Sequence, residues 1–242
     1  MTAADLSHKE IESFNDTLIK ELPKGVEILN LYGNQISSFK GCENLPNSIK
    51  ILGIFNNQIS SFEHSEGLPR NIKELYLYGN KISSFEHSEK LPRNLEILDL
   101  WVNIINSFEH SEELPRNIKE IDLGFNQISS FEHSEGLPRT LKELVIDKTQ
   151  ISSFEHLEGL PRNLKRLIDN PKIEYPQKIL RYTQFKFETS LECIKFLQHY
   201  QDFVSILNEI KYNPRLERMK SKLEEEEKQI KKDPESFYKL II

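Results

Sequence analysis

The chain has 242 residues and a formal net charge of −6, from 32 Lys and Arg against 38 Asp and Glu. This acidic balance argues against the extended basic surface of a nucleic-acid-binding protein. No run approaches the roughly 18 apolar residues of a membrane span, and no signal peptide is expected at the N-terminus. The two cysteines, Cys42 and Cys193, are too few for a disulfide framework, so a reducing, cytoplasmic setting is expected.

Residues 1–21 are expected to form a helical cap on the repeats that follow. Ser7 and Glu10 have the spacing of a capping box, which predicts a helix over residues 7–21. The apolar residues that would share one face of this helix are Ile11, Phe14, Leu18 and Ile19. A cap is needed because the end of a repeat stack otherwise exposes its apolar core.

From Leu22 to about residue 174, the chain repeats at a fixed interval of 23 residues. The dipeptide Leu-Pro marks each repeat and begins at residues 22, 45, 68, 91, 114, 137 and 160. A period of this length is typical of a solenoid, in which each unit buries its apolar face only against its neighbours. We therefore predict about seven stacked repeats over residues 22–174, with the last one shortened.

Within each repeat, the apolar residues follow the spacing L-x-x-L-x-L-x-x-N-x-L. In the third repeat these positions are Ile72, Leu75, Leu77, Asn80 and Ile82. The pattern resembles the signature of leucine-rich repeats, of either the phosphatase-regulator or the bacterial-effector type. This resemblance implies an α/β repeat solenoid: a horseshoe arc with parallel strands on its concave face and irregular or 3-10 turns on its convex side.

Two columns of residues that recur once per repeat are expected to be buried. The asparagine column should satisfy the backbone N–H and C=O groups where the chain turns after each strand. The phenylalanine column should fill the convex half of the core. Thr149 replaces asparagine in the sixth repeat, which predicts a weaker ladder there. The members are Asn34, Asn57, Asn80, Asn103 and Asn126, and Phe39, Phe62, Phe85, Phe108, Phe131 and Phe154.

A histidine beside a glutamate also recurs, in the sequence E-H-S-E or a close variant. The histidines are His64, His87, His110, His133 and His156. Both residue types bind metals, but a ladder of identical side chains points its members in parallel instead of at one ion. We interpret this column as a polar convex turn, and we expect neither a metal site nor a cofactor.

The columns that vary between repeats are those expected to face outward from the strands. Directly after the second strand leucine or isoleucine, successive repeats carry Tyr32, Phe55, Tyr78 and Trp101, which predicts a stripe of rings about 5 Å apart. An exposed run of rings usually marks an interaction site. The expected partner-binding residues are Tyr32, Phe55, Tyr76, Tyr78, Asp99, Trp101, Asp122, Phe125 and Asp147.

Residues 175–242 are expected to form a C-terminal helical extension. Apolar residues from Leu191 to Ile210 recur at helical spacing, and Asn213 before Pro214 predicts the start of a second, highly charged helix. The apolar end of this tail either docks on the first helix or binds another chain. We therefore expect either a monomer or a homo-oligomer that forms through the tail.

The sequence contains no Gly-rich phosphate loop, nucleophile elbow or H-E-x-x-H motif. We predict a non-enzymatic protein that binds a partner protein through its concave aromatic face, as an adaptor, a regulatory subunit or an effector exported without a classical signal peptide. One alternative is a catalytic effector of the ubiquitin-ligase kind, although Cys193 lacks the C-x-D setting of those enzymes. Another is a structural or oligomerising protein whose tail covers the aromatic face.

Overall fold

The structure is a computed structural model, and it describes residues 1–152, 156, 159–168, 195 and 198. The chain divides into two compact units, Met1–Ile173 and Glu174–Ile242. The second unit contains the expected helical extension and Cys193, which lie outside the described residues except for Lys195 and Gln198, both helical. The fold described below is therefore that of the first unit.

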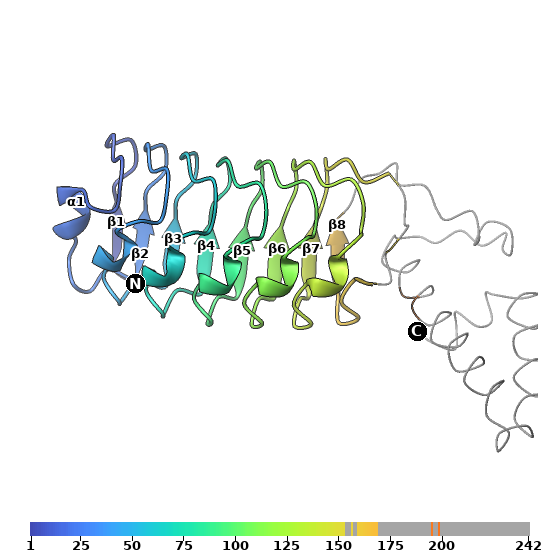
Figure 1. The fold of residues 1–242 in the computed structure, drawn as a ribbon. Coiled ribbons are helices and arrows are strands. Elements are labelled where there is room, and N and C mark those ends of the chain that lie inside the picture. The colour runs from blue at the N-terminus through green and yellow to red at the C-terminus, as the bar shows by residue number, and fades with distance from the viewer. Residues whose placement is uncertain (153–155, 157–158, 169–194, 196–197, 199–242) are drawn as a thin grey trace, which may run out of the picture. The chain divides into compact units, whose positions relative to one another are not determined.

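Eight short parallel strands form one open sheet in chain order within the described residues (Figure 1). The strands are β1 (Ala3–Asp5), β2 (Ile28–Asn30), β3 (Ile51–Gly53), β4 (Glu74–Tyr76), β5 (Ile97–Asp99), β6 (Glu120–Asp122), β7 (Glu143–Val145) and β8 (Arg166–Ile168). Leu29 pairs with Leu52 and Leu52 with Leu75, so equivalent residues of successive repeats form straight columns. The predicted solenoid of parallel strands is confirmed, and Figure 1 shows the strands side by side in a row with little curling.

Single turns of 3-10 helix lie opposite the strand in the first five repeats (Figure 1). Their bounds are Cys42–Asn44, Ser65–Gly67, Ser88–Lys90, Ser111–Glu113 and Ser134–Gly136. The residue before each turn has a left-handed backbone, which is Gly41 in the first turn and a histidine in the others. The predicted 3-10 side of the solenoid is therefore confirmed.

The asparagine and phenylalanine columns are buried between these two sides, as expected. Phe39, Phe62, Phe85, Phe108 and Phe131 have no exposed surface, and Phe154 lies outside the described residues. The carboxamide of Asn57 accepts the N–H of Ile36 at 3.0 Å and donates to the carbonyl of Leu31 at 2.9 Å, both in the preceding repeat. The same pair of bonds recurs at Asn80, Asn103 and Asn126. This ladder joins each repeat to the one before it.

The N-terminal segment differs from the helix expected over residues 7–21. Ala3–Asp5 form strand β1, which pairs in parallel with β2, and within residues 7–21 only Thr17–Lys20 are helical, as α1. Ser7 caps no helix, because its N–H donates to the Asp5 carboxylate at 2.9 Å within a turn. The expected helical cap is thus largely replaced by an incomplete repeat.

The reason lies in a spacing that suits both structures. Ile11 and Phe14 are three residues apart, as on a helical face, but Ile36 and Phe39 have the same spacing within a repeat. Ile11 and Phe14 are fully buried, and the Phe14 ring stacks on Phe39 with 6.3 Å between centroids. The N–H of Ile11 also donates to Asn34, so the ladder extends to the first turn of the chain.

Candidate functional site

A continuous run of four aromatic rings follows the carboxyl ends of strands β3 to β6. Phe55 contacts Tyr78 with 4.9 Å between ring centroids, Tyr78 contacts Trp101 at 5.7 Å, and Trp101 contacts Phe125 at 5.3 Å. These separations are close to the spacing of neighbouring strands, so each repeat contributes one ring. We call these four residues the ring run.

Tyr32 and Tyr76, also expected in the stripe, hold different positions. Tyr32 contacts the ring of His8 at 4.8 Å, and no aromatic contact joins it to Phe55 in the described part of the chain. Phe55 instead lies over Gly53, where a side chain would approach its ring to within 2.6 Å. Tyr76 contacts Phe55 at 5.6 Å and donates its hydroxyl to Glu74 at 2.7 Å. Burial and this bond to Glu74 raise the pKa of Tyr76 to about 12.

The most exposed part of the ring run lies beside two aliphatic residues. Trp101, Val102, Ile104 and Phe125 have 36%, 38%, 44% and 47% of their surfaces exposed. Apart from Met1, they are the exposed large hydrophobic residues of the described chain. We call these four residues the apolar patch. Trp101 and Phe125 are in ring contact, and exposed apolar groups of this kind usually mark an interaction site.

Ile104 was not among the predicted site residues, although the repeats contain a signal for it. The equivalent residues in the other repeats are all polar: Gln35, Gln58, Lys81, Gln127 and Gln150. An isoleucine in this exposed column is therefore not required by the scaffold. The same comparison applies to Val102, whose column otherwise contains Gly33, Asn56, Gly79, Phe125 and Lys148.

Val102 and Phe125 also occupy strained backbone positions. Their φ angles are +52° and +54°, and every other member of this column also has a positive φ. Glycine and asparagine adopt this left-handed conformation readily, whereas it costs other residues about 1–2 kcal/mol. Two bulky apolar side chains are thus held at positions where the scaffold favours glycine. Strain of this kind is typical of functional sites.

Acidic side chains lie beside the apolar patch. The carboxylate of Asp99 accepts the N–H of Trp101, and that of Asp122 accepts the N–H of Gly124, both at 2.9 Å. Burial raises the pKa of Asp99 above its usual range. Burial, with a smaller contribution from the charges of Asp99 and Asp147, raises the pKa of Asp122 to about 6. The structure thus brings together the predicted residues from Phe55 to Asp147 and leaves Tyr32 apart.

No family model and no curated protein matches the chain. Among solved structures, it is similar to a leucine-rich repeat protein of Leptospira interrogans, with 22% sequence identity and a TM-score of 0.55 over 74% of this chain and 52% of that one. The fold is that of a leucine-rich repeat protein. An internalin of Listeria monocytogenes matches with 20% identity and a TM-score of 0.47, over 70% of this chain and 55% of that one. This chain spans about half the length of each.

The recurring histidines of the leucine-rich repeats have a backbone role on the opposite side. His64, His87, His110 and His133 each precede a 3-10 turn with φ between +63° and +66°, at the position that Gly41 occupies in the first repeat. Histidine is enriched in this left-handed region. Among the described residues, no group of three or more His, Cys, Asp or Glu side chains is arranged to hold a metal ion. The shared left-handed φ, which Gly41 also adopts, favours the interpretation of the column as a turn of the scaffold.

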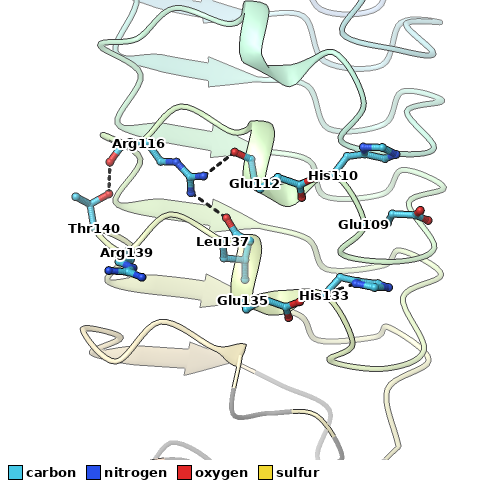
Figure 2. A pocket seen from close by; sticks show the side chains of 10 residues that line it. Glu109, His110, Glu112, Arg116, His133, Glu135, Leu137, Arg139 and Thr140 are labelled. Carbon is cyan, nitrogen blue, oxygen red and sulfur yellow. Dashed lines mark hydrogen bonds and ion pairs between the residues drawn. The ribbon is translucent and has the colours of Figure 1, made fainter.

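The hollow in Figure 2 lies between two of these turns in the leucine-rich repeat stack and has a volume of about 900 Å³. Arg116 spans it and donates to two backbone carbonyls, that of Glu112 at 2.7 Å and that of Gly136 at 3.0 Å. This arginine therefore ties one 3-10 turn to the next.

In the part of the chain that the structure describes, no helix is long and apolar enough to cross a membrane.

Proposed function

We propose that this leucine-rich repeat chain binds a partner protein through the aromatic face of its sheet, which carries the ring run. It acts without enzymatic activity, as an adaptor, a regulatory subunit or an effector. The observation that carries this proposal is the ring run, which ends in the exposed apolar patch. Aromatic side chains anchor protein interfaces because they bury a large area at little conformational cost. The structural similarity to a leucine-rich repeat protein supports the role of this fold as an interaction module.

The pattern of variation supports the same surface. The asparagine, phenylalanine and histidine columns keep one residue type through most repeats, and each has a structural reason for it. Val102, Ile104 and Phe125 differ from the glycine, asparagine or other polar residues of their columns, at positions that neither fill the core nor relieve the backbone. Packing within the repeat therefore does not explain Val102, Ile104 or Phe125, whereas contact with a partner does.

The experiment is affinity capture from cells that express the protein, with three forms of the full chain as bait. The first is wild type, the second is Tyr78→Ala with Trp101→Ala, and the third is a control, Glu86→Ala with Glu109→Ala, on the opposite side. Partners should be retained by wild type and the control and lost by the Tyr78 and Trp101 variant. All three baits must unfold in one cooperative thermal transition above the temperature of the capture experiment. Equal capture by all three would show that the ring run is not the binding surface.

A further inference from the structure

The apolar patch and the carboxylates beside it indicate what kind of partner the surface accepts. Resting on the proposed function, we propose that the partner presents an arginine or lysine side chain next to an apolar side chain. The cationic group lies between the Trp101 indole and the carboxylates of Asp122 and Asp147. The apolar side chain packs against Val102, Ile104 and Phe125.

The geometry over Gly124 supports the cationic position. A Cβ atom on Gly124 would lie 2.5 Å from the Asp147 carboxylate and 2.7 Å from the Trp101 ring. The indole and the carboxylate therefore converge over the same residue, and only glycine leaves room for both. Asp122 accepts the N–H of Gly124, so its carboxylate is held at the same place. An aromatic ring beside carboxylates suits a guanidinium or ammonium group, which gains cation–π and ionic attraction together.

The acidic residues at the two edges of the sheet differ in their ion pairing, and this difference favours a cationic group supplied by the partner. At the amino ends of the strands, three acidic residues have basic partners in neighbouring repeats: Glu27 with Lys50, Glu96 with Lys73 and Lys119, and Glu143 with Arg166. At the carboxyl ends, Asp99, Asp122 and Asp147 form no ion pair with a lysine or arginine of the described chain. Ion pairs with neighbouring repeats therefore compensate three carboxylates at the first edge, whereas none of the ion pairs of the described chain compensates these three aspartates.

Partial burial makes this unpaired edge selective. The raised pKa of Asp122 reflects desolvation and the nearby carboxylates Asp99, Asp147 and Glu143. A partner that covered these groups without supplying a cation would remove more water and leave the charges uncompensated. A basic side chain compensates them, whereas an acidic one adds repulsion. The apolar patch excludes water around that pair, as the rim of a binding hot spot does.

The test begins with a random-peptide display library panned on the full chain and on its Trp101→Ala variant. Peptides that depend on Trp101 should carry an arginine or lysine beside an apolar residue. Each selected arginine peptide is then compared with a copy that has citrulline, its uncharged isostere, in place of arginine. Trp101 is the only tryptophan of the chain, so its fluorescence reports binding directly.

Two double variants locate the charge that is recognised. Asp122→Asn with Asp147→Asn removes two carboxylates at the site, and Asn30 shows that asparagine in the column of Asp122 still accepts the turn N–H. Glu63→Gln with Glu86→Gln removes the same charge from the opposite side. Citrulline should weaken binding to wild type about tenfold. That difference should persist in the Glu63 and Glu86 variant and disappear in the Asp122 and Asp147 variant.

The outcomes separate the partner chemistry from the proposed function. Peptides that need Trp101 but carry no basic residue, or that bind equally with citrulline, would overturn the partner chemistry and leave the binding surface in place. A library that yields no Trp101-dependent peptide would overturn both. A citrulline effect that persists without Asp122 and Asp147 would also contradict the proposed site for the cation.

Discussion

The indole of Trp101 and the carboxylate of Asp147 meet over Gly124, each within 2.7 Å of the point where a Cβ atom would lie. The two residues are two repeats apart in the column, with Gly124 between them. This arrangement places an exposed ring and a carboxylate within reach of one ligand group. It depends on a missing side chain, so it is sensitive to a single methyl group.

Replacing Gly124 with alanine should displace both Trp101 and Asp147 with little loss of stability. Both neighbours are side chains at the surface edge, so they can move, and we expect the free energy of unfolding to fall by less than about 1 kcal/mol. The Trp101 emission spectrum should nevertheless shift, and partner capture should weaken. Gly25→Ala is the matched control, because no atom lies within 4 Å of its Cβ position. An unchanged Trp101 spectrum in Gly124→Ala would contradict the described contact.

Replacing Val102 with asparagine should stabilise the chain while weakening binding. Asn56 occupies the same left-handed position in another repeat, so asparagine relieves the strain, and a gain of about 0.5–1 kcal/mol is expected. Urea unfolding measures this gain, and the capture experiment measures the loss of function. Val145→Asn, within strand β7, should instead destabilise the chain, because valine suits a strand better than asparagine. A loss of stability in Val102→Asn would argue against strain at that residue.

Replacing Thr149 with asparagine should extend the ladder by one repeat. The Thr149 hydroxyl donates to the carbonyl of Ile146 at 2.7 Å, and a hydroxyl has only one hydrogen to donate. The second amide hydrogen of asparagine would reach the carbonyl of Leu123, as Asn126 reaches that of Leu100. A gain of about 1 kcal/mol in the free energy of unfolding is expected, with an opposite change in Asn126→Thr. Equal stabilities of wild type and Thr149→Asn would show that the weaker ladder has no energetic cost.

The stability difference between wild type and Asp122→Asn should depend on pH. The pKa of Asp122 is about 6 in the folded chain, whereas the unfolded chain releases this proton near the ordinary aspartate pKa of 3.8. The folded state therefore binds more protons between these values, and Asp122 destabilises it progressively as pH rises from 4 to 6. Urea midpoints at pH 4, 5, 6 and 7 should show wild type falling relative to Asp122→Asn. A difference that is constant over this range would contradict the raised pKa.

Glu96 provides the opposite sign in the same experiment. Its bonds to Lys119 and Lys73 lower the pKa of Glu96 to about 2, below the ordinary glutamate pKa of 4.5. The folded state therefore binds fewer protons, and the contribution of Glu96 to stability is present above pH 4.5 and lost as pH falls towards 2. Glu96→Gln should thus approach wild type in stability at low pH. Opposite slopes for the two variants distinguish these local effects from general acid denaturation.

Strict repetition explains why the stack was predictable from sequence. The 23-residue interval, the asparagine column and the phenylalanine column each impose one geometry on every repeat, so the parallel sheet and the 3-10 side followed from them. The N-terminal segment did not, because Ile11 and Phe14 have a spacing that fits both a helix and a repeat. Strand β1 has no leucine signature of its own, and its pairing with β2 depends on tertiary contact.

The candidate site was predictable in part for the same reason. The alternation of side chains along the strands located the ring run, but a column alone does not give the direction in which a ring turns. Phe55 folds over Gly53, and Tyr32 meets His8, a residue outside the repeats. The positive φ angles of Val102 and Phe125 also cannot be inferred from these residue types, and only the backbone geometry gives them. Ile104 could have been found from its polar column.

The most direct measurement is the affinity of a captured partner for wild type and for the Tyr78→Ala, Trp101→Ala variant, determined by titration calorimetry. If the ring run anchors the interface, affinity should fall about thirtyfold or more, which corresponds to about 2 kcal/mol. Both forms should unfold cooperatively, with the variant at a somewhat lower temperature because it loses the ring contacts to Phe55 and Phe125. An unchanged affinity in a variant that folds normally would contradict binding through this face.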